Sequence, residues 1–174
     1  LENDNSAIPS QENIEEMKKK GQTQVSSKQE RSKTSSVDSP LHIIAIGASA
    51  GGLEALQEFL INLPILDNCC VIVAQHLSPT HKSMLVQLLS RETSLEVAEA
   101  VHHGKLEANK IYITPPDSEI TISQGRIVLN KPGAAGPKPS VDILFHSLAE
   151  DAKGRLIGVI LSGTGTDGAA GIKS

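Results

Sequence analysis

Apolar residues form short runs separated by amphipathic stretches from residue 41 onward. Apolar runs predict buried strands over 42–46, 70–74 and 156–161, a short strand over 97–101, and a strand with alternating apolar positions over 110–114. Between them, apolar residues recur every three or four positions, which predicts helices over 53–60, 82–91 and 141–151. In the second helix, this spacing predicts one buried face made of Met84, Leu85, Leu88 and Leu89.

This order of elements indicates the fold class. Strands that alternate with helices are typical of a parallel sheet joined by right-handed crossovers. Segments 119–122 and 126–129 depart from that order, because they flank Ser123-Gln124-Gly125 and so resemble the two arms of a β-hairpin. We therefore predict an α/β fold, a three-layer, doubly wound and mostly parallel sheet with a β-hairpin insertion.

The first 40 residues have a different character from the rest. They are rich in Ser, Gln, Glu, Lys and Asn and show no sustained apolar period, so they cannot bury enough surface to offset their ordering entropy. We predict a disordered polar tail over 1–40 and one folded domain over 41–174. Because the chain stops just after a glycine-rich turn where a helix should begin, we expect this domain to be truncated at its C-terminus.

Composition and charge exclude several classes of function. The formal net charge is −4 and basic residues form no long run, so no nucleic-acid surface is expected. No apolar stretch approaches the roughly 20 residues that span a bilayer, and the polar start lacks a signal-peptide core, so no membrane insertion is expected. Cys69 and Cys70 are adjacent and have no second pair. They predict buried packing in a reducing, cytoplasmic compartment, with no metal or cofactor.

The turn after the first predicted strand carries a serine between glycines. Gly47-x-Ser49-x-Gly51 fits the nucleophile-elbow pattern, in which a tight strand-to-helix turn presents a serine hydroxyl and small neighbours relieve crowding. The N-terminus of the following helix offers N–H groups and a favourable dipole for an oxyanion. The pattern predicts a nucleophile at Ser49.

The same turn has a second interpretation as a dinucleotide-binding fingerprint. Aligned to G-x-G-x-x-G, it has Ser49 in place of the second glycine, which lets the backbone approach a pyrophosphate. The second strand ends in Gln75-His76 rather than in an acidic residue for a ribose. Two expected features are missing, which disfavours nucleotide binding.

Two further reactive residues follow predicted strands. His76 comes directly after the second strand, and Asp167 lies in the glycine-rich turn after the strand over 156–161. Parallel strands place their carboxyl ends at one edge of a sheet, where α/β proteins bind ligands. We therefore predict a triad in which Ser49 is the nucleophile, His76 the general base and Asp167 the carboxylate that orients the imidazole.

Five motifs together resemble the catalytic domain of the chemotaxis protein-glutamate methylesterase family, CheB. In chain order they are Gly47-Ala48-Ser49-Ala50-Gly51-Gly52, Gln75-His76-Leu77-Ser78-Pro79, Tyr112-Ile113-Thr114-Pro115-Pro116, Pro139-Ser140-Val141-Asp142 and Ser162-Gly163-Thr164-Gly165-Thr166-Asp167-Gly168. The resemblance implies a hydrolase that cleaves glutamyl methyl esters on chemoreceptor signalling helices and deamidates certain receptor glutamines.

The resemblance also assigns roles to the site residues. It implies the triad Ser49, His76 and Asp167, and the backbone N–H of Thr164 as an oxyanion donor. To these, elbow geometry adds the N–H of Ala50. Free-standing family members usually carry Thr at the place of Ala50 and Met at the place of Thr164. Both departures are more similar to the branch fused to a methyltransferase and sensor domains.

Two other classes of function are left open at this stage. The chain could be a non-catalytic regulatory module of a chemotaxis fusion protein, or a nucleotide-binding α/β domain. Forty polar residues are too few to form the phosphorylated receiver domain that precedes the catalytic domain in free-standing members.

Overall fold

The structure is a computed structural model of the chain and describes residues 40–65, 67–76, 84–134, 136–161 and 165–174. The described residues belong to one compact unit, Asp38–Ser174. The predicted disordered tail, apart from Pro40, lies outside the described residues, and so does Thr164.

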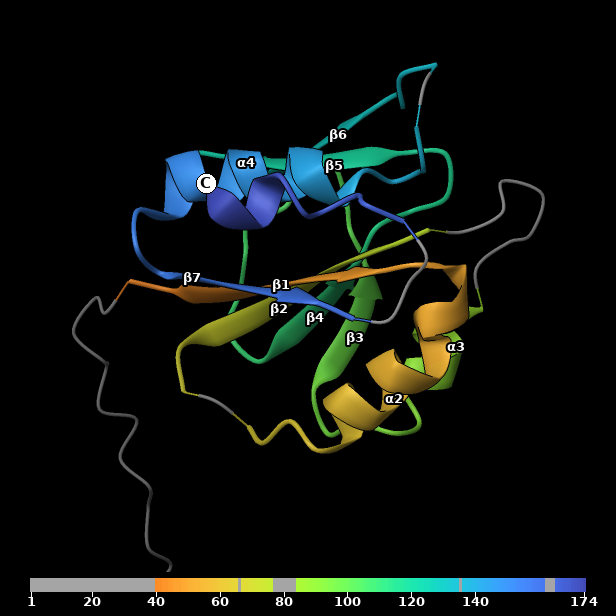
Figure 1. Cartoon of the computed structure of the whole chain (residues 1–174). Coiled ribbons are helices and arrows are strands. Elements are labelled where there is room, and N and C mark those ends of the chain that lie inside the picture. The colour runs from red at the N-terminus through yellow and green to blue at the C-terminus, as the bar shows by residue number, and fades with distance from the viewer. Residues whose placement is uncertain (1–39, 66, 77–83, 135, 162–164) are drawn as a thin grey trace, which may run out of the picture. The chain divides into compact units, whose positions relative to one another are not determined.

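A five-stranded parallel sheet forms the centre of this unit (Figure 1). Its order is β3-β4-β2-β1-β7, so the first two strands of the chain lie in the middle. The strands are β1 (His42–Ala48), β2 (Cys69–Gln75), β3 (Glu96–Glu99), β4 (Lys110–Ile113) and β7 (Leu156–Ile160). β1 pairs in parallel with β2 and β7, and β4 pairs in parallel with β2 and β3. The predicted parallel sheet is confirmed.

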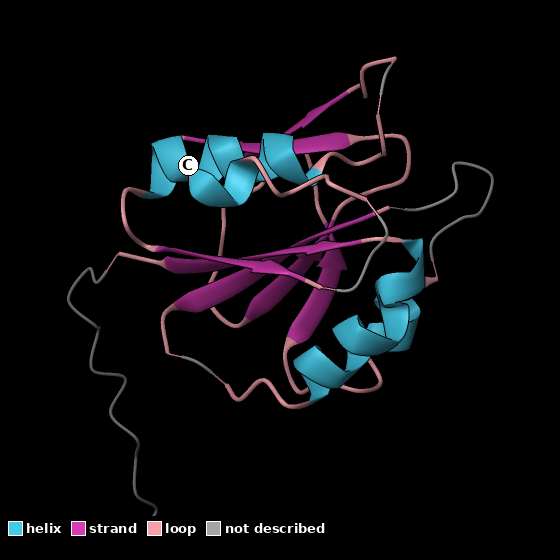
Figure 2. Ribbon diagram, viewed as in Figure 1, coloured by secondary structure: helices cyan, strands magenta, loops and turns pink. Residues whose placement is uncertain are grey.

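Helices cover both faces of the sheet (Figures 1 and 2). Because side chains alternate across a strand, Ile43 packs on the face beneath α4 (Val141–Ala152), while Ile44 packs on the opposite face. That opposite face is covered by α2 (Leu53–Ile61) and α3 (Leu85–Leu89). The three-layer, doubly wound arrangement is therefore confirmed.

The predicted hairpin is also present, on the α4 side of the sheet (Figure 2). β5 (Glu119–Ser123) and β6 (Arg126–Asn130) pair in antiparallel fashion. The two residues between them, Gln124 and Gly125, have φ values of 52° and 67°. Positive φ at both positions is the geometry of a type I′ turn, whose twist matches that of the paired strands.

Two sequence predictions about burial are wrong. Met84 was placed on a buried helix face, but its side chain is 71% exposed because it precedes the first residue of α3. The strand over 156–161 was predicted to be buried, but Ile157 is 57% and Ile160 is 44% exposed. β7 pairs only with β1 among the described strands, so one side of this apolar strand forms an edge of the sheet.

The two cysteines take part in the packing, as predicted. Cys69 and Cys70 are buried at the start of β2 and form no disulfide. Burial, and secondarily the neighbouring Cys69, raises the pKa of the Cys70 thiol to about 12, so this thiol is not a nucleophile at neutral pH.

Within the described residues, no helix is both long and apolar enough to cross a bilayer.

Close packing explains the glycine at the end of β1. A Cβ atom built on Gly47 would lie 2.3 Å from a methyl carbon of Val141, the first residue of α4. Val141 is only 2% exposed, so its side chain has no room to move aside. Gly47 therefore allows the start of α4 to reach the edge of the sheet.

This contact gives a prediction about stability. Gly47→Ala should lower the free energy of unfolding by about 1–3 kcal/mol through overpacking. Adding Val141→Ala removes the obstructing methyl groups, so the double variant should be more stable than the sum of the two single effects predicts. Urea unfolding of the four proteins checks this, and additive effects would show that the two side chains do not collide.

Candidate active site

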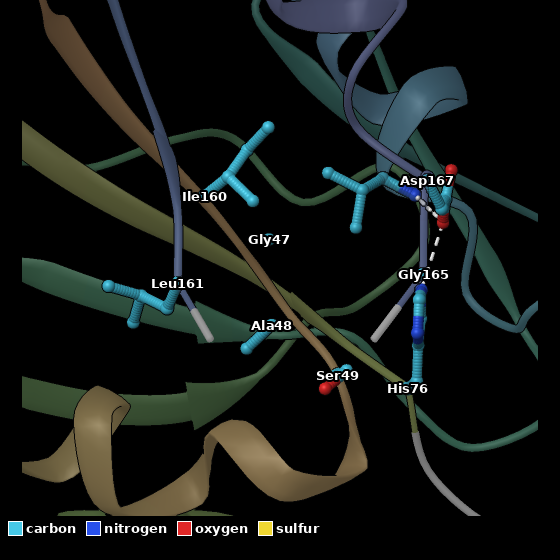
Figure 3. Close-up of a pocket in the computed structure, with 9 residues that line it drawn as sticks. Gly47, Ala48, Ser49, His76, Ile160, Leu161, Gly165 and Asp167 are labelled. Atoms are coloured by element: carbon cyan, nitrogen blue, oxygen red, sulfur yellow. Dashed lines mark hydrogen bonds and ion pairs between the residues drawn. The ribbon is translucent and has the colours of Figure 1, made fainter. Parts of the chain in front are cut away.

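The three residues predicted as a triad line one pocket. Ser49 follows β1, His76 follows β2, and Asp167 comes after β7, so three parallel strands direct them to the same edge of the sheet (Figure 3). Among the described residues, the rest of the lining is largely apolar and comprises Gly47, Ala48, Val141, Ile160, Leu161 and Gly165. The cavity between these residues measures about 40 Å³.

Ser49 lies at a turn with ordinary backbone geometry. It precedes the short 3₁₀ helix Ala50–Gly52, and the Gly52 N–H donates to the Ser49 carbonyl at 2.9 Å. Its φ and ψ are −83° and 176°, an extended conformation without strain. A Cβ on Gly51 would meet nothing within 4 Å. The predicted crowding around a sharp elbow is therefore wrong for Gly51, and Gly47 is needed because of Val141 instead.

His76 is fixed at both its backbone and its side chain. Its N–H donates to the Ala48 carbonyl at 2.9 Å, which continues the pairing of β2 with β1. Its imidazole Nε2 lies 2.9 Å from Asp167 Oδ2, and the two side chains are 18% and 7% exposed. Of the predicted triad contacts, the one between imidazole and carboxylate is thus formed in the structure.

Asp167 sits at the N-terminus of α4. Its Oδ2 accepts from the Val141 N–H at 2.8 Å, and its Oδ1 accepts from the Asp142 N–H at 3.0 Å and the Ser140 hydroxyl at 3.1 Å. Helix N-termini favour negative charge because their first N–H groups have no partner within the helix. The start of α4 thus holds this carboxylate in place.

These contacts decide the charge of Asp167. Burial alone would raise its pKa, but the backbone N–H groups of Val141 and Asp142, then His76 and Ser140, outweigh burial and lower the pKa below its ordinary value. Asp167 is therefore an anion at neutral pH. An ionised carboxylate can only accept hydrogen bonds, so His76 Nε2 carries the proton that it donates to Asp167.

The other imidazole nitrogen is then the one that can accept a proton. In a neutral imidazole, the nitrogen without a proton is an acceptor, and here that atom is Nδ1. The Ser-His-Asp arrangement of the serine proteases uses the opposite orientation, in which Nδ1–H binds the aspartate. In Figure 3 the Ser49 hydroxyl oxygen lies on the side of the serine away from the imidazole.

The predicted oxyanion donors are the backbone N–H groups of Ala50 and Thr164. Ala50 opens the 3₁₀ helix directly after Ser49, so its N–H is at the start of a helical turn, as the elbow pattern predicts. Thr164 lies outside the described residues. Both donor assignments stay predictions.

The sequence analysis gave no separate role to two residues at the start of α4. Ser140 is the N-cap of α4, and its hydroxyl both accepts from the Ile143 N–H and donates to Asp167. Asp142, in the first turn, accepts hydrogen bonds from the segment that contains Asp167. A Ser followed two positions later by an acidic residue at a predicted helix start was the available signal.

The lowered pKa of Asp167 predicts how stability depends on pH. The folded pKa lies below the unfolded one, so the ionised carboxylate stabilises the fold above its ordinary pKa, and this stabilisation is lost as pH falls toward the folded value. Asp167→Asn should therefore destabilise the chain at pH 7 and have a smaller effect at about pH 3. Urea unfolding of both proteins at several pH values checks this; a stability difference that does not change with pH would contradict it.

Comparisons with known proteins agree with this arrangement. Residues 44–174 match the family model described as CheB methylesterase. A protein-glutamate methylesterase/protein-glutamine glutaminase from Rhizobium etli is 41% identical over 137 residues, which is 75% of this chain and 39% of that protein. One with the same name from Salmonella typhimurium is 36% identical over 135 residues, 75% of this chain and 38% of that protein. The chain thus spans about two fifths of the length of these relatives.

A solved structure shares the fold. The crystal structure of the Thermotoga maritima CheB methylesterase catalytic domain aligns with a TM-score of 0.68 and 30% sequence identity, and the alignment covers 76% of this chain and 73% of that one. With a family model matched over most of its length and a solved relative of the same fold, this chain belongs to the CheB methylesterase family.

Proposed function

We propose that this chain is the catalytic part of a protein-glutamate methylesterase that also deamidates glutamine side chains. The observation that carries the proposal is the 2.9 Å contact between His76 Nε2 and the Asp167 carboxylate, in a pocket that Ser49 also lines. A serine hydroxyl becomes a nucleophile only beside a correctly oriented base. The family relationship supplies the substrate class, because the curated relatives are named for both reactions.

The proposed reaction is acyl transfer. Ser49 Oγ attacks the ester carbonyl carbon while His76 Nδ1 takes the hydroxyl proton, and Asp167 stabilises the imidazolium that forms. The proton then passes to the methoxy oxygen, and methanol leaves an acyl-enzyme on Ser49. Water gives a proton to the same imidazole as it attacks the acyl carbon, that proton passes to Ser49 Oγ as the acyl bond breaks, and the released glutamic acid ionises to a carboxylate. With a glutamine side chain, ammonia leaves in place of methanol.

The lining of the pocket is consistent with this substrate. A glutamyl methyl ester carries one polar carbonyl group and an apolar methyl group at the end of an unbranched chain. The apolar side chains of Val141, Ile160 and Leu161 face the same cavity as the polar triad. The N–H groups of Ala50 and Thr164 are proposed to bind the oxyanion.

We further propose the cellular setting from the family relationship. The substrates are methylated signalling helices of chemoreceptors, reached in the cytoplasm. Methyltransferase and sensor domains are proposed to follow in the full-length protein, as in the fused branch that the sequence resembles.

The nucleophile gives the first activity prediction. Ser49→Ala should reduce the release of labelled methanol from methylated receptor by on the order of 10⁴-fold or more, because the residues of a triad act as a unit. Ser123→Ala, an exposed serine at the end of β5, is the matched control and should keep full activity.

A double variant distinguishes a triad whose residues act as a unit from residues that contribute to the rate independently. His76→Gln should lose about as much activity as Ser49→Ala, and the double variant should lose little more. Full methanol release by folded Ser49→Ala would overturn the proposed function. A serine-directed probe that fails to label Ser49 in the unmodified chain would instead favour a non-catalytic module.

A further inference from the structure

The Asp142 carboxylate binds three backbone N–H groups of one loop. Its Oδ1 accepts from Gly168 at 2.9 Å, from Ala170 at 3.1 Å and from Gly171 at 2.6 Å. None of these donors belongs to α4, the helix that carries Asp142. The carboxylate is thus a link between α4 and the segment that follows Asp167.

The link is reciprocal. Asp167 accepts from the N–H groups of Val141 and Asp142 in the first turn of α4, while Asp142 accepts from the residues directly after Asp167. Each aspartate therefore accepts hydrogen bonds from backbone N–H groups in the segment that carries the other aspartate. The first turn of a helix and a loop rich in unpaired N–H groups both favour anions, so the two carboxylates can lie close together.

Glycines make this close approach possible. A Cβ on Gly171 would lie 2.9 Å from the Asp142 carbonyl oxygen and 2.8 Å from Phe145 Cβ. Gly168 has φ +95°, and a Cβ there would lie 2.8 Å from a methyl carbon of Val141. Both contacts indicate that the loop is packed directly onto the first turns of α4.

We propose that Asp142 is a positioning residue for the esterase reaction. Its carboxylate holds the loop over 168–171 against α4 and thereby keeps the adjacent Asp167 within hydrogen-bonding reach of His76 Nε2. This inference rests on the proposed function, in which the imidazole must present Nδ1 to Ser49. Asp142 is not among the described residues that line the pocket.

Loss of the Asp142 carboxylate should affect the rate of the esterase reaction through the position of Asp167. Removing the carboxylate leaves three N–H groups without their acceptor, and the loop can then carry Asp167 away from the imidazole. A displacement of about 1 Å in a catalytic group costs about 10²-fold in rate. Because the Asp167–His76 contact acts on the proton transfer, the loss should fall on kcat rather than on KM.

The test compares Asp142→Ala with Asp142→Asn in the full chain. Asp142→Ala should lower kcat for methanol release by about 10²-fold with little change in KM, and should abolish the downfield proton resonance of the His76–Asp167 hydrogen bond. Asp142→Asn keeps an oxygen at the Oδ1 position, so it should retain the resonance and most of the activity.

Asp151 provides a matched control on the same helix. Its carboxylate accepts from the Gly125 N–H of the hairpin at 3.1 Å, far along α4 from the first turn. Asp151→Ala should lower the midpoint of thermal unfolding but leave kcat and the imidazole resonance unchanged.

The outcomes separate this inference from the proposed function. A folded Asp142→Ala protein with unchanged kcat and resonance would overturn the positioning role. If Asp142→Ala does not fold, hydrogen exchange in the unmodified chain decides: the amides of Gly168, Ala170 and Gly171 should be protected, and exchange at the rate of an unstructured peptide would overturn the role. An unmodified chain that shows the resonance but releases no methanol would refute only the proposed function.

Discussion

The placement of a carboxylate at the start of a helix is the interaction on which the site depends. Asp167 lies on a glycine-rich loop, which alone would leave its side chain many orientations. The first N–H groups of α4 and the Ser140 hydroxyl bind both of its oxygens and keep it ionised despite its burial. An anion fixed in this way determines which imidazole nitrogen of His76 holds a proton, and so which nitrogen can act as a base.

The rest of the fold brings α4 to that position. Its apolar face, with Leu144, Phe145 and Leu148, is buried against one side of the sheet, and the hairpin β5–β6 packs on the same helix. Glycine at position 47 lets the first residue of α4 approach the end of β1, so the helix begins beside the pocket rather than above the middle of the sheet. The packing of α4 on the sheet thus places its first N–H groups where they bind the Asp167 carboxylate.

Much of this could be predicted from the sequence because it depends on local periodicity. Strands and helices follow from alternation and helical spacing, the hairpin follows from the Ser123-Gln124-Gly125 signal, and the predicted triad residues all follow apolar strands. The exposure of Met84 and of β7 could not be predicted, because it depends on where a helix begins and on which strand lies at the edge of the sheet. The roles of Ser140 and Asp142 arise between segments about 26 residues apart, and no local pattern encodes that pairing.

The position of the proton on the His76 ring is the most direct test of the role given to Asp167. We predict that ¹⁵N chemical shifts of a histidine-labelled chain, recorded in the pH range where the His76 ring carries a single proton, place that proton on Nε2, and that Asp167→Asn disturbs this state. A His76 protonated on Nδ1, or one whose state is unaffected by Asp167→Asn, would contradict it.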